Sequence, residues 1–309
     1  MRKVLVLGGT GLVGRRLTET LLRGGFAVRC SVRNPERARQ VLPAACEIVQ
    51  GDIGDLRSMQ AATRSVEAVY NTVHTLSAQK SGSPNGSFVD AELAGLEHIV
   101  AACRENGVRR MVYLTFLGIA PDGPTEWARG RWKAEQLLLH SGLDATVLRP
   151  AQIVGKGGFG FDSMMAQARR RVTPVLGSGK GRHRNIALDD LVHYMVRVLD
   201  EPRAFGKAFD VGCDDVLTTD EMIDTAARVL GKAPPRKVHV PLGLLRRVAP
   251  LIERAAKLPR GAFRDLAVGM DLDMVGDPRP LREIIPHEPL RYAQAIERAL
   301  QGDESRPPR

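Results

Sequence analysis

The sequence is poor in aromatic residues and cysteine, and it contains no long apolar run. Aromatic side chains make up 5% of the 309 residues, and none interleaves with the basic clusters, which argues against binding of single-stranded nucleic acid by base stacking. The four cysteines are widely spaced and form no C-x-x-C pair, so neither a zinc site nor a disulfide framework is indicated. We expect four small buried side chains: Cys30, Cys46, Cys103 and Cys213.

The absence of a long apolar run and the net charge limit the expected location and partners of the protein. No segment approaches the roughly 20 apolar residues of a membrane-spanning helix, and the N-terminus does not resemble a secretory signal, so a cytoplasmic location is expected. The net charge of +10 suits nucleic acid, an acidic membrane surface or a phosphorylated ligand. No DNA-binding or RNA-binding motif is recognisable, so nucleic acid is not expected as the partner.

Short apolar runs alternate with amphipathic stretches through the first half, which predicts βαβ units and a Rossmann-type doubly wound α/β fold. Strands are predicted at 3–7, 27–32, 47–50, 68–72, 110–115 and 146–149, and helices at 11–23, 35–42, 56–63, 88–106 and 127–141. Residues 1–155 are predicted to form a dinucleotide-binding domain. Residues 156–300 would add the last sheet strands and a small substrate-binding part, and 301–309 a disordered tail.

The glycines of "GGTGLVG" follow the first predicted strand and open the first predicted helix. Gly8, Gly11 and Gly14 have the spacing that lets a backbone turn tightly and approach a pyrophosphate at the helix N-terminus. The residues between them that would share this contact are Thr10, Leu12 and Val13. The alternative is a purely structural strand-to-helix turn.

The second strand indicates which dinucleotide binds. An acidic residue at its end would bind the ribose of NAD, whereas "VRCSVRNPERAR" supplies Arg33 and Arg37, which suit the 2′-phosphate of NADP(H). The alternative is that these arginines only solvate a helix start. After the third strand, Asp52 is placed to hydrogen-bond the adenine and Ile53 to pack on it, unless Asp52 caps the next helix.

Six segments together resemble the atypical short-chain dehydrogenases/reductases of the NmrA-like branch. They are "GGTGLVG", "VRNPERA", "GDIGD", "VYNTVH", "SGLDATVLRPAQIVG" and "AFDVGCDDVLTTDEM", within about residues 1–240. This branch also contains divinyl-reductase-like enzymes and the nucleotide-binding accessory subunit of respiratory complex I. The resemblance implies that Thr72 and the backbone from Pro150 to Ile153 contact the cofactor.

Typical members of this superfamily transfer protons with a Tyr-x-x-x-Lys pair on the helix after the fifth strand, and the resemblance places Lys133 at the lysine position. Arg129 stands four residues earlier and cannot act as a general acid at neutral pH. Thr115 matches the neighbourhood of the family's serine. Three interpretations remain. Lys133 binds the ribose while water or the substrate supplies the proton, or the cofactor is bound and never turned over. In the third interpretation another acid replaces the tyrosine, and the candidates are Tyr70, His74 and Tyr113.

These observations favour an NADP(H)-dependent oxidoreductase that transfers a hydride to an apolar enone-like or quinone-like acceptor. The alternative is a non-catalytic NADP(H)-binding sensor or scaffold. The glycine-rich segment 156–162 is a candidate lid, and the basic runs at 169–171 and 180–184 are either a substrate-side surface or a solvated face. Helix 242–258 is basic and amphipathic, which suits peripheral membrane contact or packing on the core, with a kink at Pro250.

Overall fold

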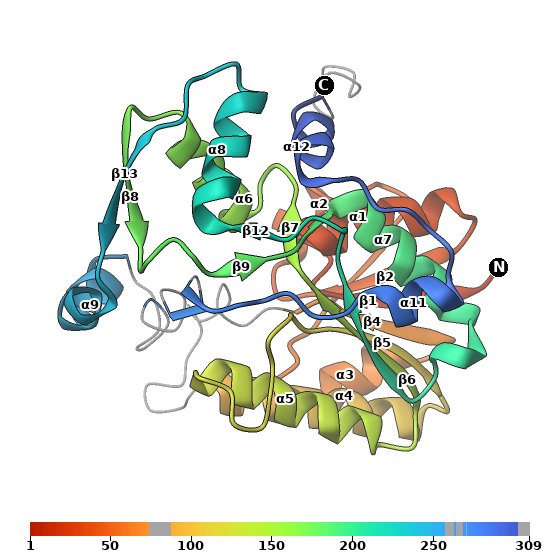
Figure 1. Ribbon diagram of the computed structural model, residues 1–309. Helices are drawn as coiled ribbons and strands as arrows, with labels where there is room; N and C mark the ends of the chain where they lie inside the picture. The colour runs from red at the N-terminus through yellow and green to blue at the C-terminus, as the bar shows by residue number, and fades with distance from the viewer. Residues whose placement is uncertain (74–87, 257–262, 264–267, 270, 302–309) are drawn as a thin grey trace.

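A seven-stranded parallel sheet forms the centre of the computed structural model, which describes residues 1–73, 88–256, 263, 268–269 and 271–301. The strand order is β11-β6-β5-β4-β1-β2-β3 (Figure 1). The strands are β1 (Lys3–Leu7), β2 (Ala27–Val32), β3 (Glu47–Gln50), β4 (Ala68–Asn71), β5 (Arg110–Leu114), β6 (Asp144–Pro150) and β11 (Lys207–Val211). The predicted Rossmann-type α/β fold is therefore confirmed.

Helices cover both faces of the sheet because each inner strand is apolar on both sides. Val4 and Val6 point into one core, and Leu5 and Leu7 point into the other, as the alternation of side chains along a strand requires. The first core is covered by α1 (Leu12–Arg23), α2 (Pro35–Arg39) and α7 (Leu188–Arg197). The second is covered by α3 (Leu56–Thr63), α4 (Phe88–Glu105) and α5 (Glu126–Leu139), which lie together on one side of the sheet in Figure 1.

A smaller part with its own core follows β6 and is built mostly after residue 150. Its helices α6 (Phe159–Ala168), α8 (Thr219–Val229) and α12 (Tyr292–Gln301) bury a third apolar cluster. Three two-stranded sheets join it: β7 (Gln152–Val154) with β10 (Asn185–Ala187), β9 (Arg182–His183) with β12 (Leu217–Thr218), and β8 (Val172–Leu176) with β13 (Arg236–Val240). The remaining elements are α9 (Leu242–Ala256), α11 (Arg279–Ile284), and the 3-10 turns η2 (Val198–Asp200) and η3 (Pro202–Ala204).

Some predicted boundaries move, for identifiable reasons. The helix predicted at 35–42 ends at Arg39, and its continuation is disfavoured because Leu42 precedes Pro43. The segment predicted as a lid at 156–162 is a short turn followed by α6, which begins at Phe159. All four cysteines are buried, as expected. Residues 302–309 of the predicted tail lie outside the described residues.

Candidate functional site

The carboxyl ends of the parallel strands bring most of the predicted site residues to one edge of the sheet. Leu7 at the end of β1 pairs in register with Ser31 of β2 and Asn71 of β4, and Asn71 pairs with Tyr113 of β5. Ligands of doubly wound sheets bind at this edge. The segments that meet there are the Gly8–Gly14 turn, Arg33, Asp52, Thr72, Thr115 and Pro150.

The glycine turn has no room for side chains. Gly8 adopts a positive φ of +81°, and the N–H of Gly11 donates to the carbonyl oxygen of Gly8 at 2.9 Å. A Cβ on Gly14 would lie 2.2 Å from that same oxygen. Among the described residues no side chain caps α1 at Gly11, which leaves first-turn amides available to an anion. The turn therefore fits a pyrophosphate.

The side chains between these glycines differ in how far they are buried. Thr10 is exposed at the tip of the turn, whereas Val13 is buried in the core. Leu12 packs against the turn before α6, because a Cβ on Gly158 would lie 2.8 Å from Leu12 Cδ2. Leu12 and Val13 thus pack against the protein beside the turn.

Sequence reasoning missed Arg15, a cation beside this turn. Its side chain is half-buried, and its Nη2 would lie 3.8 Å from a Cβ on Gly157. Its Nε is buried without a hydrogen-bond acceptor among the described residues. The sequence could have indicated this cation, because Arg15 directly follows Gly14 of the predicted turn.

The end of β2 is positively charged. Arg33 follows Val32 and is exposed, and Arg37 is exposed on α2. The arginine inside the strand, Arg29, is bound to Glu47 at 2.8 Å and is not available to a ligand. Two exposed guanidinium groups therefore stand where an NAD-binding strand would carry an acid.

Asp52 and Ile53 follow β3 at the same edge of the sheet. The Asp52 carboxylate accepts from the N–H of Gly54 at 2.9 Å, while α3 is capped by Asp55, whose side chain accepts from the N–H of Arg57. The capping alternative for Asp52 is therefore wrong. Ile53 packs against α4, since a Cβ on Gly95 would lie 2.7 Å from its Cδ1.

Helix α5 carries Lys133 and Arg131 on opposite faces. Lys133 is exposed, whereas Arg131 is 1% exposed on the face that packs against the sheet. Two residues correspond to about 200° of rotation around a helix, so the two side chains lie on opposite faces. Trp127 precedes Arg131 by four residues, so the sheet-facing pair with Tyr-x-x-x-Lys spacing is Trp127 and Arg131, while the role of Lys133 at the cofactor stays a prediction. The buried positions Ala128, Ala134 and Leu138 were the sequence signal for this face.

Arg131 is held in a buried network. Its Nε lies 2.6 Å from Glu92 of α4, and its Nη1 donates to the Tyr113 hydroxyl at 3.2 Å and to the Leu114 carbonyl oxygen at 3.1 Å. A further bond runs from Nη2 to the carbonyl oxygen of Val73 at 3.4 Å. The guanidinium therefore joins α5, α4, β5 and the end of β4, with both Nη atoms donating hydrogen bonds and Nε in an ion pair with Glu92.

The other candidate acids do not face the site. The Tyr113 hydroxyl donates to Glu92 at 2.9 Å, and Tyr70 is 0% exposed in the opposite core. Burial raises the pKa of both phenols, so neither releases a proton to a substrate near neutral pH. His74 lies outside the described residues.

Two aromatic side chains lie next to Thr115. Phe116 follows it directly, and the ring of Phe116 lies 4.3 Å from the ring of Trp127 between centroids. Thr115 itself is buried, and its N–H donates to the carbonyl oxygen of Leu148 at 2.9 Å. Arg129 is turned toward the loop before α5, donating to the carbonyl oxygen of Gly123 at 2.6 Å. The end of β5 therefore carries Thr115 near the predicted serine position, followed by the aromatic pair Phe116 and Trp127.

The remaining predicted cofactor contacts serve the scaffold. The Thr72 hydroxyl donates to the carbonyl oxygen of Leu7 at 2.8 Å and packs on Gly8. The Pro150 carbonyl accepts from the N–H of Leu117 at 3.1 Å, and Ile153 pairs with Ile186 in the β7–β10 ladder. These residues shape the edge where the nicotinamide half was predicted to lie.

The basic run at 180–184 is used largely inside the protein. Arg182 binds Asp273 with its Nε at 2.9 Å, and Arg184 donates to the carbonyl oxygens of Cys213 and Asp214. These bonds join distant segments of the smaller part. Both guanidinium groups thus have partners within the protein.

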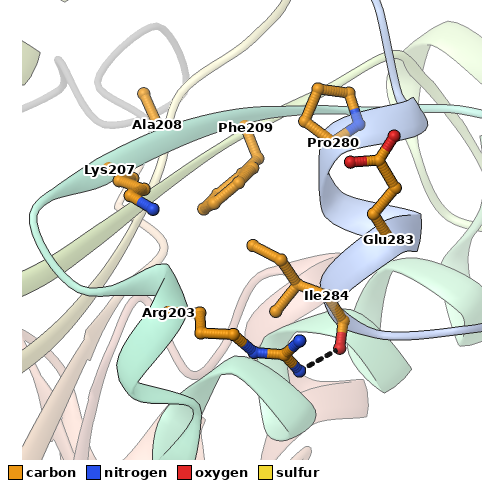
Figure 2. A pocket seen from close by; sticks show the side chains of 7 residues that line it. All are labelled: Arg203, Lys207, Ala208, Phe209, Pro280, Glu283 and Ile284. Carbon is orange, nitrogen blue, oxygen red and sulfur yellow. Dashed lines mark hydrogen bonds between the residues drawn. The ribbon is translucent and has the colours of Figure 1, made fainter.

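An open pocket of about 570 Å³ lies elsewhere, between the start of β11 and α11 (Figure 2). Phe209 and Ile284 form its apolar wall, and Arg203 donates to the carbonyl oxygen of Ile284 at 2.9 Å. Because it adjoins the first residues of β11, it lies toward the opposite edge of the sheet from the glycine turn. It is not part of the dinucleotide site.

Two common kinds of site are absent from the described residues. No helix there is long and apolar enough to cross a membrane. No group of three or more His, Cys, Asp or Glu side chains in the same residues is arranged to hold a metal ion.

A family model described as NAD(P)H-binding matches residues 8–202, which include the glycine turn and α5. The chain belongs to the NAD(P)H-binding family. It is 26% identical over 253 residues to the mitochondrial NADH dehydrogenase 1 alpha subcomplex subunit 9 of Arabidopsis thaliana, across 79% of this chain but 61% of that protein. This NAD(P)H-binding chain is also 25% identical over 242 residues to an NAD(P)H azoreductase of Xenophilus azovorans, across 77% of each. The predicted resemblance to short-chain dehydrogenases/reductases, complex I subunit included, is confirmed.

Solved structures support the same fold. A dTDP-glucose 4,6-dehydratase from Bacillus anthracis in complex with NAD superposes with a TM-score of 0.75 at 14% identity, covering 99% of this chain and 98% of that one. At this identity the likeness concerns the fold alone. Membership of the NAD(P)H-binding family thus rests on the sequence, and the solved structures support the Rossmann-type fold.

Proposed function

We propose that this protein is an NADP(H)-dependent reductase that transfers a hydride to a planar apolar acceptor of the enone or quinone class, without a tyrosine acid. The observation that carries the proposal is the aromatic pair Phe116 and Trp127 near the end of β5, with ring centroids 4.3 Å apart and ring planes tilted by 34°. A flat conjugated ring packs favourably on such a surface. A relative named as an NAD(P)H azoreductase supports an acceptor with a conjugated system.

The strand order supports one orientation of the cofactor in this proposal. With its pyrophosphate at the glycine turn after β1, the adenosine half extends toward β2 and β3, where Arg33 and Asp52 lie. The nicotinamide half then extends toward β4 and β5, the side of the aromatic pair. When bound there, the nicotinamide supplies the hydride.

The charges favour NADP(H) over NAD(H). Arg33 and Arg37 are exposed at the end of β2, and Arg15 adds a third cation at the base of the glycine turn. A guanidinium binds a 2′-phosphate through charge-assisted hydrogen bonds, whereas no acidic side chain of β2 is present to bind a 2′-hydroxyl.

The chemistry needs no protein-borne proton donor if the acceptor spreads negative charge over a conjugated system. Hydride addition to a quinone gives a delocalised anion that takes its proton from water. Trp127 has no ionisable proton, and Arg131 stays charged at neutral pH. The two residues therefore position the acceptor and stiffen the site.

The test follows the absorbance of NADPH, with NADH as control, against a panel of quinones and enones. We expect wild-type turnover, and a Trp127→Ala variant whose KM for the acceptor rises about tenfold while its Kd for NADPH stays within twofold. Trp132→Ala is the matched control, because Trp132 lies on the same helix about 140° away from Trp127. If Trp132→Ala has the same effect as Trp127→Ala, the aromatic pair is not the acceptor site.

A sensor or scaffold is the second candidate, favoured by the burial of Arg131 in an ion pair with Glu92 and hydrogen bonds within the protein. In that case NADPH binds tightly and no member of the panel is reduced. Its binding would then be expected to change a measurable property of the protein, such as protease sensitivity of the smaller part.

A further inference from the structure

Exposed apolar side chains gather at one end of the smaller part. Of the six large hydrophobic side chains exposed among the described residues, four lie on the β8–β13 ribbon or on α9: Val172, Val238, Leu244 and Leu251. In Figure 1 the ribbon leads directly into α9, which lies at the side of the molecule away from the seven-stranded sheet. These elements therefore present apolar surface where the sheet does not cover it.

Helix α9 has an outer face made of two leucines and two arginines, named here the basic leucine face. Leu244, Arg247, Leu251 and Arg254 recur at spacings of three and four residues, which places them on one side of the helix. Leu244 is 53% exposed and Leu251 is 71% exposed, and both arginines are exposed. The inner side carries Ala249 and Glu253, which are 4% and 6% exposed.

The neighbouring ribbon repeats this combination. Val172 pairs in register with Arg236, and Val238 is two residues further along the same strand as Arg236. These side chains share one face of the ribbon because residues two apart in a strand point the same way. The exposed arginines at 169–171 directly precede Val172. Apolar and positive groups thus alternate over both elements.

We propose that α9 and the exposed face of the β8–β13 ribbon bind the surface of an anionic phospholipid membrane. A helix of this kind lies in the plane of the interface, with its leucines among the acyl chains and its arginines at the lipid phosphates. Glu253, the acidic residue of α9, is on the inner side and does not repel the lipid. The surface is independent of the reductase activity proposed above.

Charge also argues against a second copy of the chain as the occupant. A twofold interface places the same patch on both partners, so Arg247 and Arg254 would face their own copies. Like charges brought together in this way are destabilising, and the basic leucine face carries no carboxylate to offset them. An anionic surface matches both the leucines and the arginines.

The test is sedimentation of the full chain with vesicles of phosphatidylcholine alone, or of phosphatidylcholine and phosphatidylglycerol in equal parts. We expect binding to the mixed vesicles, weakened by about 1 M salt because the Debye length is then about 3 Å. Replacing both arginines by Ala should lower the partition coefficient about 10- to 30-fold, at about fivefold for each arginine. Leu244→Ser with Leu251→Ser should lower it at least about tenfold.

Two controls isolate the surface. The double variant Arg109→Ala with Arg279→Ala removes the same charge from exposed positions elsewhere. The variant Phe159→Ser removes another exposed apolar side chain. Both control variants should bind the mixed vesicles as wild type does. A Leu251→Trp variant gives a second readout, since its emission should shift to shorter wavelength on the mixed vesicles. Equal binding to neutral vesicles, equal loss in the controls, or a dimer without vesicle binding would each overturn the proposal.

Discussion

Replacing Gly14 by Ala should disable the glycine turn without unfolding the chain. The added Cβ would lie 2.2 Å from the Gly8 oxygen and 2.8 Å from the Cα of Gly9, whereas ordinary contact begins at 3.4 Å. The turn must therefore open by about 1 Å, an overpacking that costs roughly 1–3 kcal/mol of stability. A displacement of that size moves a backbone amide out of hydrogen-bond range of a bound phosphate.

The expected loss of affinity follows from the number of amides displaced. One hydrogen bond to a charged group contributes about 1.5–3 kcal/mol, and about 1.4 kcal/mol corresponds to a tenfold change in Kd. We therefore expect Gly14→Ala to raise the Kd for NADPH about 10- to 100-fold, as measured by isothermal titration calorimetry.

Gly24→Ala is the matched control at the other end of α1. There the nearest atoms to an added Cβ lie at 3.4 Å, and the φ of −76° suits alanine. Its Kd should stay within twofold of wild type. Unchanged affinity in Gly14→Ala, with a urea midpoint showing that the protein is folded, would refute the placement of the pyrophosphate on this turn.

Other substitutions test the neighbouring assignments. Arg33→Asp should raise the Kd for NADPH about tenfold or more and leave the Kd for NADH equal or lower, as measured by titration with each nucleotide. An unchanged ratio of the two Kd values would show that Arg33 does not bind the 2′-phosphate. Lys133→Ala should leave the Kd for NADPH within twofold, and a tenfold rise would restore the lysine to the cofactor site. Glu92→Gln should lower the free energy of unfolding in urea by about 3–5 kcal/mol, because a buried guanidinium loses its carboxylate; a loss below about 1 kcal/mol would contradict that account. Burial, and next the charge of His287, lower the pKa of His193 in the folded state below 6.5. The unfolded state therefore binds the proton more readily, and the stability of the fold should decrease as the pH drops from 7 through 6.5. His193→Gln should flatten this part of the plot of urea midpoint against pH, and an unchanged slope would exclude His193 as the source of the pH dependence.

Much of the sheet and the dinucleotide turn could be predicted because their signals are local. The run "KVLVL" is apolar at every position after its lysine, as a strand buried on both faces requires, and β1 forms at the predicted residues. The turn after it depends on glycines within seven residues of one another. The capping box of α8 is equally local, with Thr218 and Glu221 three residues apart.

The residues on α5 could not be assigned in this way. Its polar and apolar residues give two candidate pairs with the same four-residue spacing, Arg129 with Lys133 and Trp127 with Arg131. What distinguishes them is the position of Glu92 on α4 and of the Val73 carbonyl after β4, which are remote in sequence. A shift of two residues reverses the helix face, so a motif match alone was insufficient.

The sequence by itself determined the parallel α/β scaffold, the glycine turn and the positive charge at the end of β2, because each depends on residues adjacent in the chain. Only the tertiary structure decided that Arg131 is buried and Lys133 is exposed, and that Tyr70 and Tyr113 lie inside the two cores. It also decided which side of α9 faces outward. These outcomes depend on burial against distant elements, and burial is a property of the packed chain rather than of any short segment.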